Sequence, residues 1–372
     1  MSEPIRPITM PKWGLAMTEG RVAAWLVEEG IDIAPGDEIV EIETTKITSV
    51  FESPVGGVLR RRVAAEGETL PVGALLAVAA APTVSDAEIE GFLEAFQADF
   101  AGQAAETAER EPEPDFVEAG GRRLRYLRLG EGDDPPALLM HGFGGDLNNW
   151  MFNQPVLAEA RTVYALDLPG HGGSSKAVGA GDVAALGAAA AEFLDALDIE
   201  RAHLVGHSLG GAIALLLALE RPARAASLTL VAPAGLGAEI NGDYIEGFIG
   251  ARRQKDLKAV LALLFADPQL VSRDMVDEIL KYKRLDGVEA ALTTIAGQAF
   301  AEGRQQALLA ERLPELSVPA QVIWGRSDRI IPARHAESLP ETIALHLLDG
   351  GHMVHMERAR EVNALIANFV AA

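Results

Sequence analysis

The sequence predicts a multidomain protein: an all-β sandwich comes first, and an α/β domain with a mainly parallel sheet and a helical cap follows. The first 80 residues contain an internal repeat of short β-rich runs separated by glycine turns. From residue 116 onward, strand-like and helix-like runs alternate, and a Gly-x-Ser-x-Gly sequence stands between one strand and one helix. Such alternation implies parallel pairing, with the chemistry carried by loops at the carboxyl ends of the strands.

Composition excludes several classes of function. The chain of 372 residues has 49% hydrophobic residues and a formal net charge of −22, which argues against nucleic acid and anionic membrane surfaces as partners. No apolar run has the length of a membrane span, and the first residues do not resemble a secretory signal. Cysteine is absent, so disulfides, thiolate metal sites and a cysteine nucleophile are excluded. We expect a cytoplasmic protein without a metal centre.

An internal repeat organises the first 80 residues. Glycine and apolar positions recur at an offset of 37 residues, so that Gly20 and Gly36 correspond to Gly57 and Gly73. Two similar halves predict two similar sheets that pack face to face as a small β-sandwich.

Residues 39–51, between the two halves, consist of two β-rich runs around a polar centre, so we expect Lys46 at or near the tip of a hairpin. The run Met10–Gly20 resembles the opening of lipoyl domains, and Glu-Thr-Thr-Lys at residues 43–46 resembles their modification site. Residues 5–80 as a whole resemble the lipoyl/biotinyl carrier domain. Biotinyl domains usually carry methionines around the lysine, which favours lipoyl over biotinyl. The resemblance implies lipoate in amide linkage on Lys46, attached by a lipoate ligase; a hairpin lysine is otherwise an ordinary solvated residue.

An acidic connector follows at residues 81–115. Ser85 and Glu88 have the spacing of a capping box. They open a predicted helix whose apolar stripe comprises Ile89, Phe92, Leu93, Phe96 and Phe100. The stripe fits two interpretations, docking onto one of the chain's own domains or binding a partner enzyme. The Ala-, Glu- and Pro-rich residues 101–114 are predicted to be a flexible, charged linker.

The sequence Gly206-His207-Ser208-Leu209-Gly210 has an apolar strand before it and a small-residue, leucine-rich helix after it. This is the context of a nucleophile elbow, in which a serine occupies a sharp strand-to-helix turn. A chance pentapeptide would not need a strand and a helix on the correct sides. Residues 116–372 resemble the α/β-hydrolase superfamily across their length, and the mixed, mostly helical residues 236–310 have the position of an inserted cap.

That resemblance implies a triad in the order serine, acid, histidine. The strand that ends at Val231 offers no acid, whereas the next strand is followed by Asp328. Among the later histidines, only His352 falls in a loop between the last strand and the last helix; those within predicted helices or a strand are His335, His346 and His355. We expect Ser208 as nucleophile, His352 as general base and Asp328 as the group that fixes the imidazole tautomer. An aspartate in such a turn can also simply bond its own backbone.

A tetrahedral intermediate needs backbone N–H donors. The resemblance implies one donor from Leu209, which follows the nucleophile, and one from the loop after the strand at residues 137–140. The run His141-Gly142-Phe143-Gly144 resembles that loop, with Phe143 as the donor. His141 is expected to brace the loop.

A lipoyl-type domain before an α/β-hydrolase-type domain resembles the dihydrolipoamide acetyltransferase component of bacterial acetoin dehydrogenase systems. The resemblance implies transfer of an acetyl group from dihydrolipoyl-Lys46 to coenzyme A through Ser208. It also implies two protein partners: a thiamine-diphosphate-dependent component that cleaves acetoin, and a flavoprotein, dihydrolipoamide dehydrogenase. Two alternatives remain, a lipoyl-linked thioesterase that releases the acyl group to water and a lipoyl carrier or scaffold with an idle hydrolase domain. A homo-oligomer is compatible with the sequence.

No coenzyme A motif is visible in the sequence. Four basic residues early in the cap either meet the phosphates of coenzyme A or form a solvated helix face: Arg252, Arg253, Lys255 and Lys258. The expected division of the chain is a lipoyl carrier domain at 1–80, an acidic helix and flexible linker at 81–115, and a catalytic domain at 116–372 with its cap at about 236–310.

Overall fold

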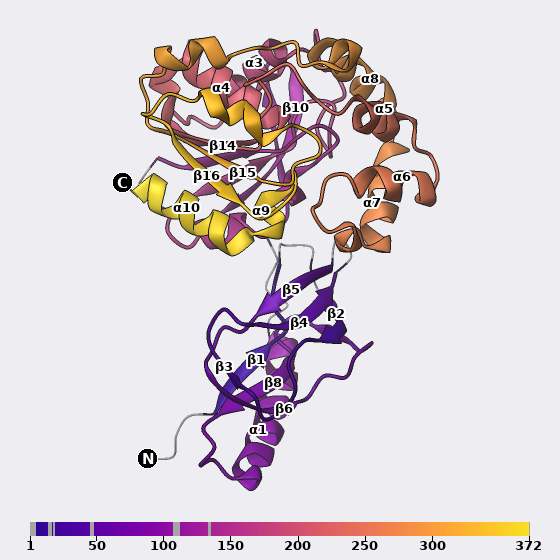
Figure 1. The fold of residues 1–372 in the computed structure, drawn as a ribbon, viewed down its shortest axis with the longest axis vertical. Helices are drawn as coiled ribbons and strands as arrows, with labels where there is room; N and C mark the ends of the chain where they lie inside the picture. Colours follow the sequence, from indigo (N-terminus) through magenta and orange to yellow (C-terminus); the bar gives the residue numbers. More distant parts are fainter. Residues whose placement is uncertain are drawn as a thin grey trace. The chain divides into compact units, whose positions relative to one another are not determined.

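The computed structural model describes residues 5–13, 17, 19–44, 48–106, 112–132 and 135–371. The chain forms two compact units, the first built around residues 1–111 and the second around residues 112–268 and 276–372 (Figure 1). None of the helices in the described residues is both long and apolar enough to cross a membrane.

The first unit is the predicted all-β sandwich of two four-stranded sheets. One sheet has the order β1 (Arg6–Thr9), β8 (Leu75–Ala80), β6 (Gly57–Arg62), β3 (Asp32–Ile33). The other has the order β5 (Thr48–Glu52), β4 (Glu38–Glu43), β2 (Glu19–Trp25), β7 (Thr69–Pro71). The repeat explains this arrangement, because the paired apolar positions of the two halves are fully buried between the sheets: Val22 with Leu59, and Ile39 with Leu76.

The predicted hairpin around the modification motif is confirmed by its two strands. β4 and β5 pair antiparallel, and Glu43 lies opposite Thr48 at the end of the ladder. Lys46 and its neighbours 45 and 47 lie outside the described residues.

Helix α1 (Asp86–Glu106) packs on the first unit. The capping box is present, because the Ser85 N–H donates to Glu88 Oε2 at 2.9 Å and the Glu88 N–H donates to Ser85 Oγ at 3.3 Å. Ile89 is 1% exposed, and with Phe92 it joins an apolar cluster formed by β8. The stripe therefore docks onto the chain's own domain. The helix also continues to Glu106, into the segment predicted to be a linker, because alanine, glutamine and glutamate favour helix.

The second unit contains an eight-stranded sheet in the order β16-β15-β14-β13-β11-β12-β10-β9. The six strands from β12 to β16 pair in parallel, and β10 and β9 add an antiparallel edge. Their bounds are β9 (Asp115–Ala119), β10 (Arg122–Leu129), β11 (Ala137–Met140), β12 (Val163–Leu166), β13 (Ala202–His207), β14 (Ala225–Val231), β15 (Ala320–Gly325) and β16 (Ala344–Leu348). Every residue of β11, β13 and β15 is buried, as expected for parallel strands covered on both faces.

Helices cover both faces of this sheet. Helices α3 (Val183–Ala196) and α4 (Leu209–Glu220) lie on one face, and α10 (Ala359–Ala371) lies on the other (Figure 1). Short helices fill the connections: α2 (Gln154–Leu157), α9 (Val354–Glu357), η1 (Leu147–Trp150), η2 (Pro222–Arg224), η5 (Ala310–Glu315) and η6 (Ala333–Ser338). The sequence predicts a single last helix from about Val354 to Val370, but this helix is broken at Arg358, whose backbone leaves the helical region (φ −126°, ψ 44°).

The segment 236–310, predicted to be mostly helical, holds six helices in the described structure. They are α5 (Gly242–Gly250), α6 (Gln254–Leu261), η3 (Pro268–Leu270), α7 (Arg273–Lys283), α8 (Val288–Ala299) and η4 (Ala301–Gly303). An isolated bridge between Glu239 and Arg304 joins the two ends of the segment, which we call the cap.

Candidate active site

Ser208 occupies the turn between β13 and α4. Its backbone has φ 52° and ψ −117°, a strained conformation for a residue with a side chain. The turn depends on its flanking glycines: a Cβ on Gly206 would lie 2.2 Å from the Gly210 carbonyl oxygen, and a Cβ on Gly210 would lie 2.2 Å from that of Met140. This close approach of strand and helix is what the Gly-x-Ser-x-Gly pattern predicted.

Asp328 and His352 form a buried pair. The His352 Nδ1 lies 2.8 Å from Asp328 Oδ2, and the two side chains are 2% and 0% exposed. Trp324 Nε1 donates to the same carboxylate oxygen at 2.9 Å. The other oxygen accepts the backbone N–H groups of Ile330 and Ile331 at 2.8 and 3.0 Å. The carboxylate is therefore fixed from both sides and can hold the imidazole with Nδ1 protonated.

The loop that carries His352 is bonded to the elbow. His207, which precedes Ser208, directs Nε2 to the His352 carbonyl oxygen at 3.0 Å, and the two rings lie 4.7 Å apart. Burial lowers the pKa of His207 well below its ordinary value, so this ring is neutral and donates from Nε2. The structure thus gives His207 a structural role, and it brings the predicted base and the predicted nucleophile onto adjacent backbone.

The predicted oxyanion donors, Phe143 and Leu209, are also at this place. A Cβ on Gly142 would lie 3.0 Å from Ser208 Cβ, so the loop after β11 touches the nucleophile. Leu209 is the first residue of α4, where backbone N–H groups have no intrahelical partner. Within the described part of the chain, neither the Phe143 nor the Leu209 N–H donates to another protein group. Both remain available to a negative oxygen.

Two neutral histidines hold the loop in this conformation. His141 directs Nδ1 to the Gly142 carbonyl oxygen at 2.7 Å, and its Nε2 accepts the Leu168 N–H at 3.0 Å. The Nε2 of His171 accepts the Gly144 N–H at 3.1 Å. Burial lowers the pKa of both imidazoles, that of His171 well below its ordinary value, and an uncharged ring can act as such an acceptor. His141 therefore braces the loop, as expected.

The cap supplies aromatic residues that the sequence reasoning missed. The Phe143 ring packs edge-on against Phe248 of α5 at 6.0 Å and against Phe300 after α8 at 5.9 Å. The Tyr244 hydroxyl donates to the Phe143 carbonyl oxygen at 3.3 Å. These contacts join the cap to the loop after β11, which holds the predicted oxyanion donor Phe143, and line the surroundings of this loop with apolar surface. Aromatic residues in an otherwise mixed segment were the available signal.

The four basic residues considered as phosphate ligands or as a solvated helix face are all exposed. Arg253 is bonded to Asp256 at 2.7 Å with 81% of its side chain exposed, and Lys255 and Lys258 are exposed on α6. Arg252 differs, because it pairs with Glu289 of α8 at 2.8 Å and lines a pocket.

Both units match known families. Residues 135–359 match the family model of the alpha/beta hydrolase fold, and residues 6–78 match that described as biotin-requiring enzyme. The solved structure of the meta-cleavage product hydrolase from Pseudomonas fluorescens IP01 is similar with a TM-score of 0.62 and 24% identity, covering 68% of this chain and 96% of that chain. At this identity the likeness concerns the fold alone.

Two relatives align along nearly the whole chain. The dihydrolipoyllysine-residue acetyltransferase component of the acetoin cleaving system from Pseudomonas putida is 50% identical over 367 residues, with 98% of each chain covered. The protein of the same name from Cupriavidus necator is 47% identical over 369 residues, covering 98% of this chain and 97% of that protein. Because these alignments run through the carrier-type unit and the hydrolase-type unit alike, the chain belongs to the family of dihydrolipoyllysine-residue acetyltransferase components of acetoin cleaving systems.

Proposed function

We propose that the chain transfers an acetyl group from a dihydrolipoyl group on Lys46 to coenzyme A through Ser208, Asp328 and His352. The observation that carries the proposal is the buried His352–Asp328 pair at 2.8 Å, bonded through His207 to a serine in a strained turn. The family name supports the acetyl group and the lipoyl donor.

In the first half-reaction His352 acts as general base. Its Nδ1 proton is held by Asp328, so the unprotonated Nε2 accepts the Ser208 Oγ proton as Oγ attacks the thioester carbonyl of the donor. The N–H groups of Phe143 and Leu209 stabilise the oxyanion. The new Oγ–C bond remains, the C–S bond breaks, and His352 gives its proton to the departing thiolate.

In the second half-reaction the same groups act in reverse order. His352 takes the proton of the coenzyme A thiol, and the sulfur attacks the acetyl-serine carbonyl. The S–C bond forms, the Oγ–C bond breaks and the proton returns to Ser208. Transfer instead of hydrolysis requires that the acyl-serine meet a thiol and not water, which fits the apolar surroundings formed by Phe143, Phe248 and Phe300.

The hairpin of β4 and β5 fits a covalently attached carrier group. The strands pair up to Glu43 and Thr48, so residues 44–47 form their connection, and Lys46 is the attachment point. When bound and in its reduced, dihydrolipoyl form, this group would supply a thiol that holds an acetyl group as a thioester.

The proposal also includes the domain boundaries of the chain and its partner proteins. The carrier domain occupies 1–80, the helix and linker 81–115, and the catalytic domain 116–372 with the cap at about 236–310. The partners are a thiamine-diphosphate-dependent component that cleaves acetoin, dihydrolipoamide dehydrogenase and a lipoate ligase, all in the cytoplasm, and a homo-oligomer is compatible with this assembly.

The test follows consumption of S-acetyldihydrolipoamide by the full chain with and without coenzyme A. We expect acetyl-coenzyme A to form and the Ser208→Ala variant to lose roughly 10⁴-fold or more in kcat, whereas Ser317→Ala, a serine before β15, stays near the unaltered protein. Equal consumption without coenzyme A would identify a thioesterase. No consumption by a chain whose mass shows lipoylated Lys46 would identify a carrier with an idle hydrolase domain.

A further inference from the structure

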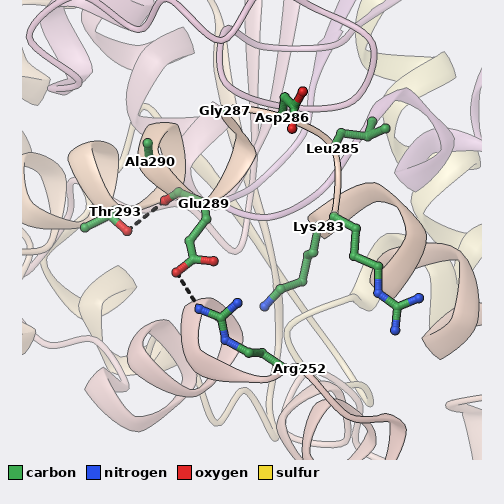
Figure 2. Close-up of a pocket in the computed structure, with 9 residues that line it drawn as sticks. Arg252, Lys283, Leu285, Asp286, Gly287, Glu289, Ala290 and Thr293 are labelled. Atoms are coloured by element: carbon green, nitrogen blue, oxygen red, sulfur yellow. Dashed lines mark hydrogen bonds and ion pairs between the residues drawn. The ribbon is translucent and has the colours of Figure 1, made fainter.

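The cap contains a pocket with a volume of about 790 Å³ (Figure 2). It lies where α5 ends and where the connection from α7 to α8 passes, and all its residues belong to the second unit. Its lining includes three cations, Arg252, Lys283 and Arg284, and two carboxylates, Asp286 and Glu289. The pocket therefore carries a positive balance in a chain whose overall charge is −22. A cationic pocket on an acidic protein fits an anionic ligand.

The cation Arg252 is available to a ligand. Its partner is Glu289 at 2.8 Å, and the two side chains are 73% and 52% exposed. Figure 2 shows this ion pair, with the side chain of Lys283, the last residue of α7, reaching toward the same region. Exposed pairs of this kind contribute little free energy, so a phosphate can share or displace the carboxylate at small cost.

The cation Lys283 is positioned by the cap itself. Its ammonium donates to the carbonyl oxygens of Phe248 and Ile249, the latter at 3.2 Å, at the end of α5. An ammonium has three N–H bonds, so among the described contacts one remains for a ligand. Partial burial lowers the pKa of Lys283 to about 8, which leaves the group mainly charged at neutral pH.

The same lysine connects the pocket to the oxyanion loop. Its ammonium lies 4.8 Å from the centre of the Phe248 ring, and this ring packs on Phe143. A Cβ on Gly144 would lie 2.5 Å from Phe248, so the contact between cap and loop is tight. A single aromatic ring thus separates a cationic anchor from the loop that faces Ser208.

A ligand for this arrangement has several phosphates at one end and a reactive group at the other. The cations suit phosphate oxygens, and a guanidinium can also stack on a purine. The side chain of Leu285, 54% exposed at the pocket, adds an apolar surface for a base. Coenzyme A has this form, with an adenosine 3′-phosphate 5′-diphosphate at one end and a thiol at the other.

We propose that Arg252, Lys283 and Arg284 bind the phosphorylated adenosine end of coenzyme A. The proposal rests on the acetyltransferase function above and assigns the acceptor's binding site to the cap. Of the four basic residues considered as phosphate ligands, the proposal keeps Arg252 and adds Lys283 and Arg284, while the other three form the solvated face that was the alternative.

The test compares coenzyme A with pantetheine, which has the same thiol but no nucleotide. In the full chain, Arg284→Gln and Arg252→Gln should each reduce the ratio of kcat/KM for coenzyme A to that for pantetheine by roughly ten- to a hundredfold, the worth of a hydrogen bond to a charged group. Lys283→Gln should act likewise, but Lys283 also holds α5. Arg253→Gln is the matched control, since the Arg253 guanidinium is next to Arg252 in the sequence but is paired with Asp256 and does not line the pocket. This variant should leave the ratio unchanged.

A binding measurement separates this proposal from the function on which it rests. Adenosine 3′,5′-bisphosphate should bind the unaltered chain in calorimetry and bind the Arg284→Gln variant at least tenfold more weakly. Serine-dependent formation of acetyl-coenzyme A with an unchanged ratio in all pocket variants would overturn the pocket assignment alone. Tight nucleotide binding by a chain that forms no acetyl-coenzyme A would support the site and overturn the acetyltransferase function.

Discussion

The two units are built in different ways. The first has no histidine, is organised by two similar sheets and presents its proposed attachment site between two paired strands. The second contains all eight histidines of the chain and assembles its site from β13, β15, the loop after β11 and the loop before α9. Carrying an acyl group requires a reachable side chain, whereas transferring it requires several groups fixed against one another.

The largest effect should come from breaking the acid–base pair in the second unit. Asp328→Asn keeps the shape but presents an N–H to the imidazole, which favours the wrong tautomer, and kcat should fall roughly 10⁴-fold. The first unit of this variant should still be lipoylated to the same extent as in the unaltered chain, as measured by intact-mass spectrometry. The control is Asp349→Asn, whose side chain is 82% exposed and 3.4 Å from Arg326; it should change kcat less than about twofold. An active Asp328→Asn variant would remove this residue from the triad.

A smaller effect should follow acidification, which should lower the stability of the second unit more than that of the first. Burial lowers the pKa of His171 and His207 well below the ordinary 6.5, and burial lowers that of His355 to about 3. Below about pH 6.5 the unfolded chain takes up protons that the folded unit excludes. Each such histidine therefore removes about 1.4 kcal/mol of stability per pH unit, or about 4 kcal/mol for the three.

Calorimetry between pH 7 and pH 5.5 measures this difference. The transition of the second unit should move to lower temperature with acid, while that of the first unit, which has no histidine, should move far less. Equal shifts in both units would show that buried neutral imidazoles do not set the acid stability.

The smallest effect should be confined to the first unit. Ser85→Ala removes the side-chain half of the capping box of α1 and should lower the local stability of that helix by about 1 kcal/mol. Hydrogen exchange of the α1 amides measures it, with Glu90→Gln, which loses only an exposed pair with Arg61, as the control. Turnover of free S-acetyldihydrolipoamide should be the same as for the unaltered chain. Exchange that accelerates in the second unit as well would contradict the separation of the two units.

Local patterns were predictable from the sequence. The glycines around Ser208 predict a tight turn, and the Ser85–Glu88 spacing predicts the start of a helix. Both patterns can be recognised because the structures depend only on neighbours within a few residues. The chain order of Ser208, Asp328 and His352 was also readable, since each follows a recognisable strand. Whether these residues catalyse as proposed remains a prediction.

Features set by packing were not predictable. The break at Arg358 and the hydrogen bonds of the half-buried Lys283 to the end of α5 depend on which faces meet in the folded cap and sheet. The neutral state of His171 and His207 follows from burial, which the sequence does not display. The apolar stripe of α1 was visible, but its partner became clear only from its contacts with β8.

The hydrogen bond between His207 and His352 joins residues 145 positions apart. A ribosome adding about 5–20 residues per second needs roughly seven to thirty seconds to synthesise that stretch. During this interval the carrier strands are complete, and Ser208 has been synthesised without its base. We therefore expect the carrier domain to be complete before the catalytic unit becomes active. An unfinished catalytic unit, which lacks His352, would then not consume thioesters of the cell.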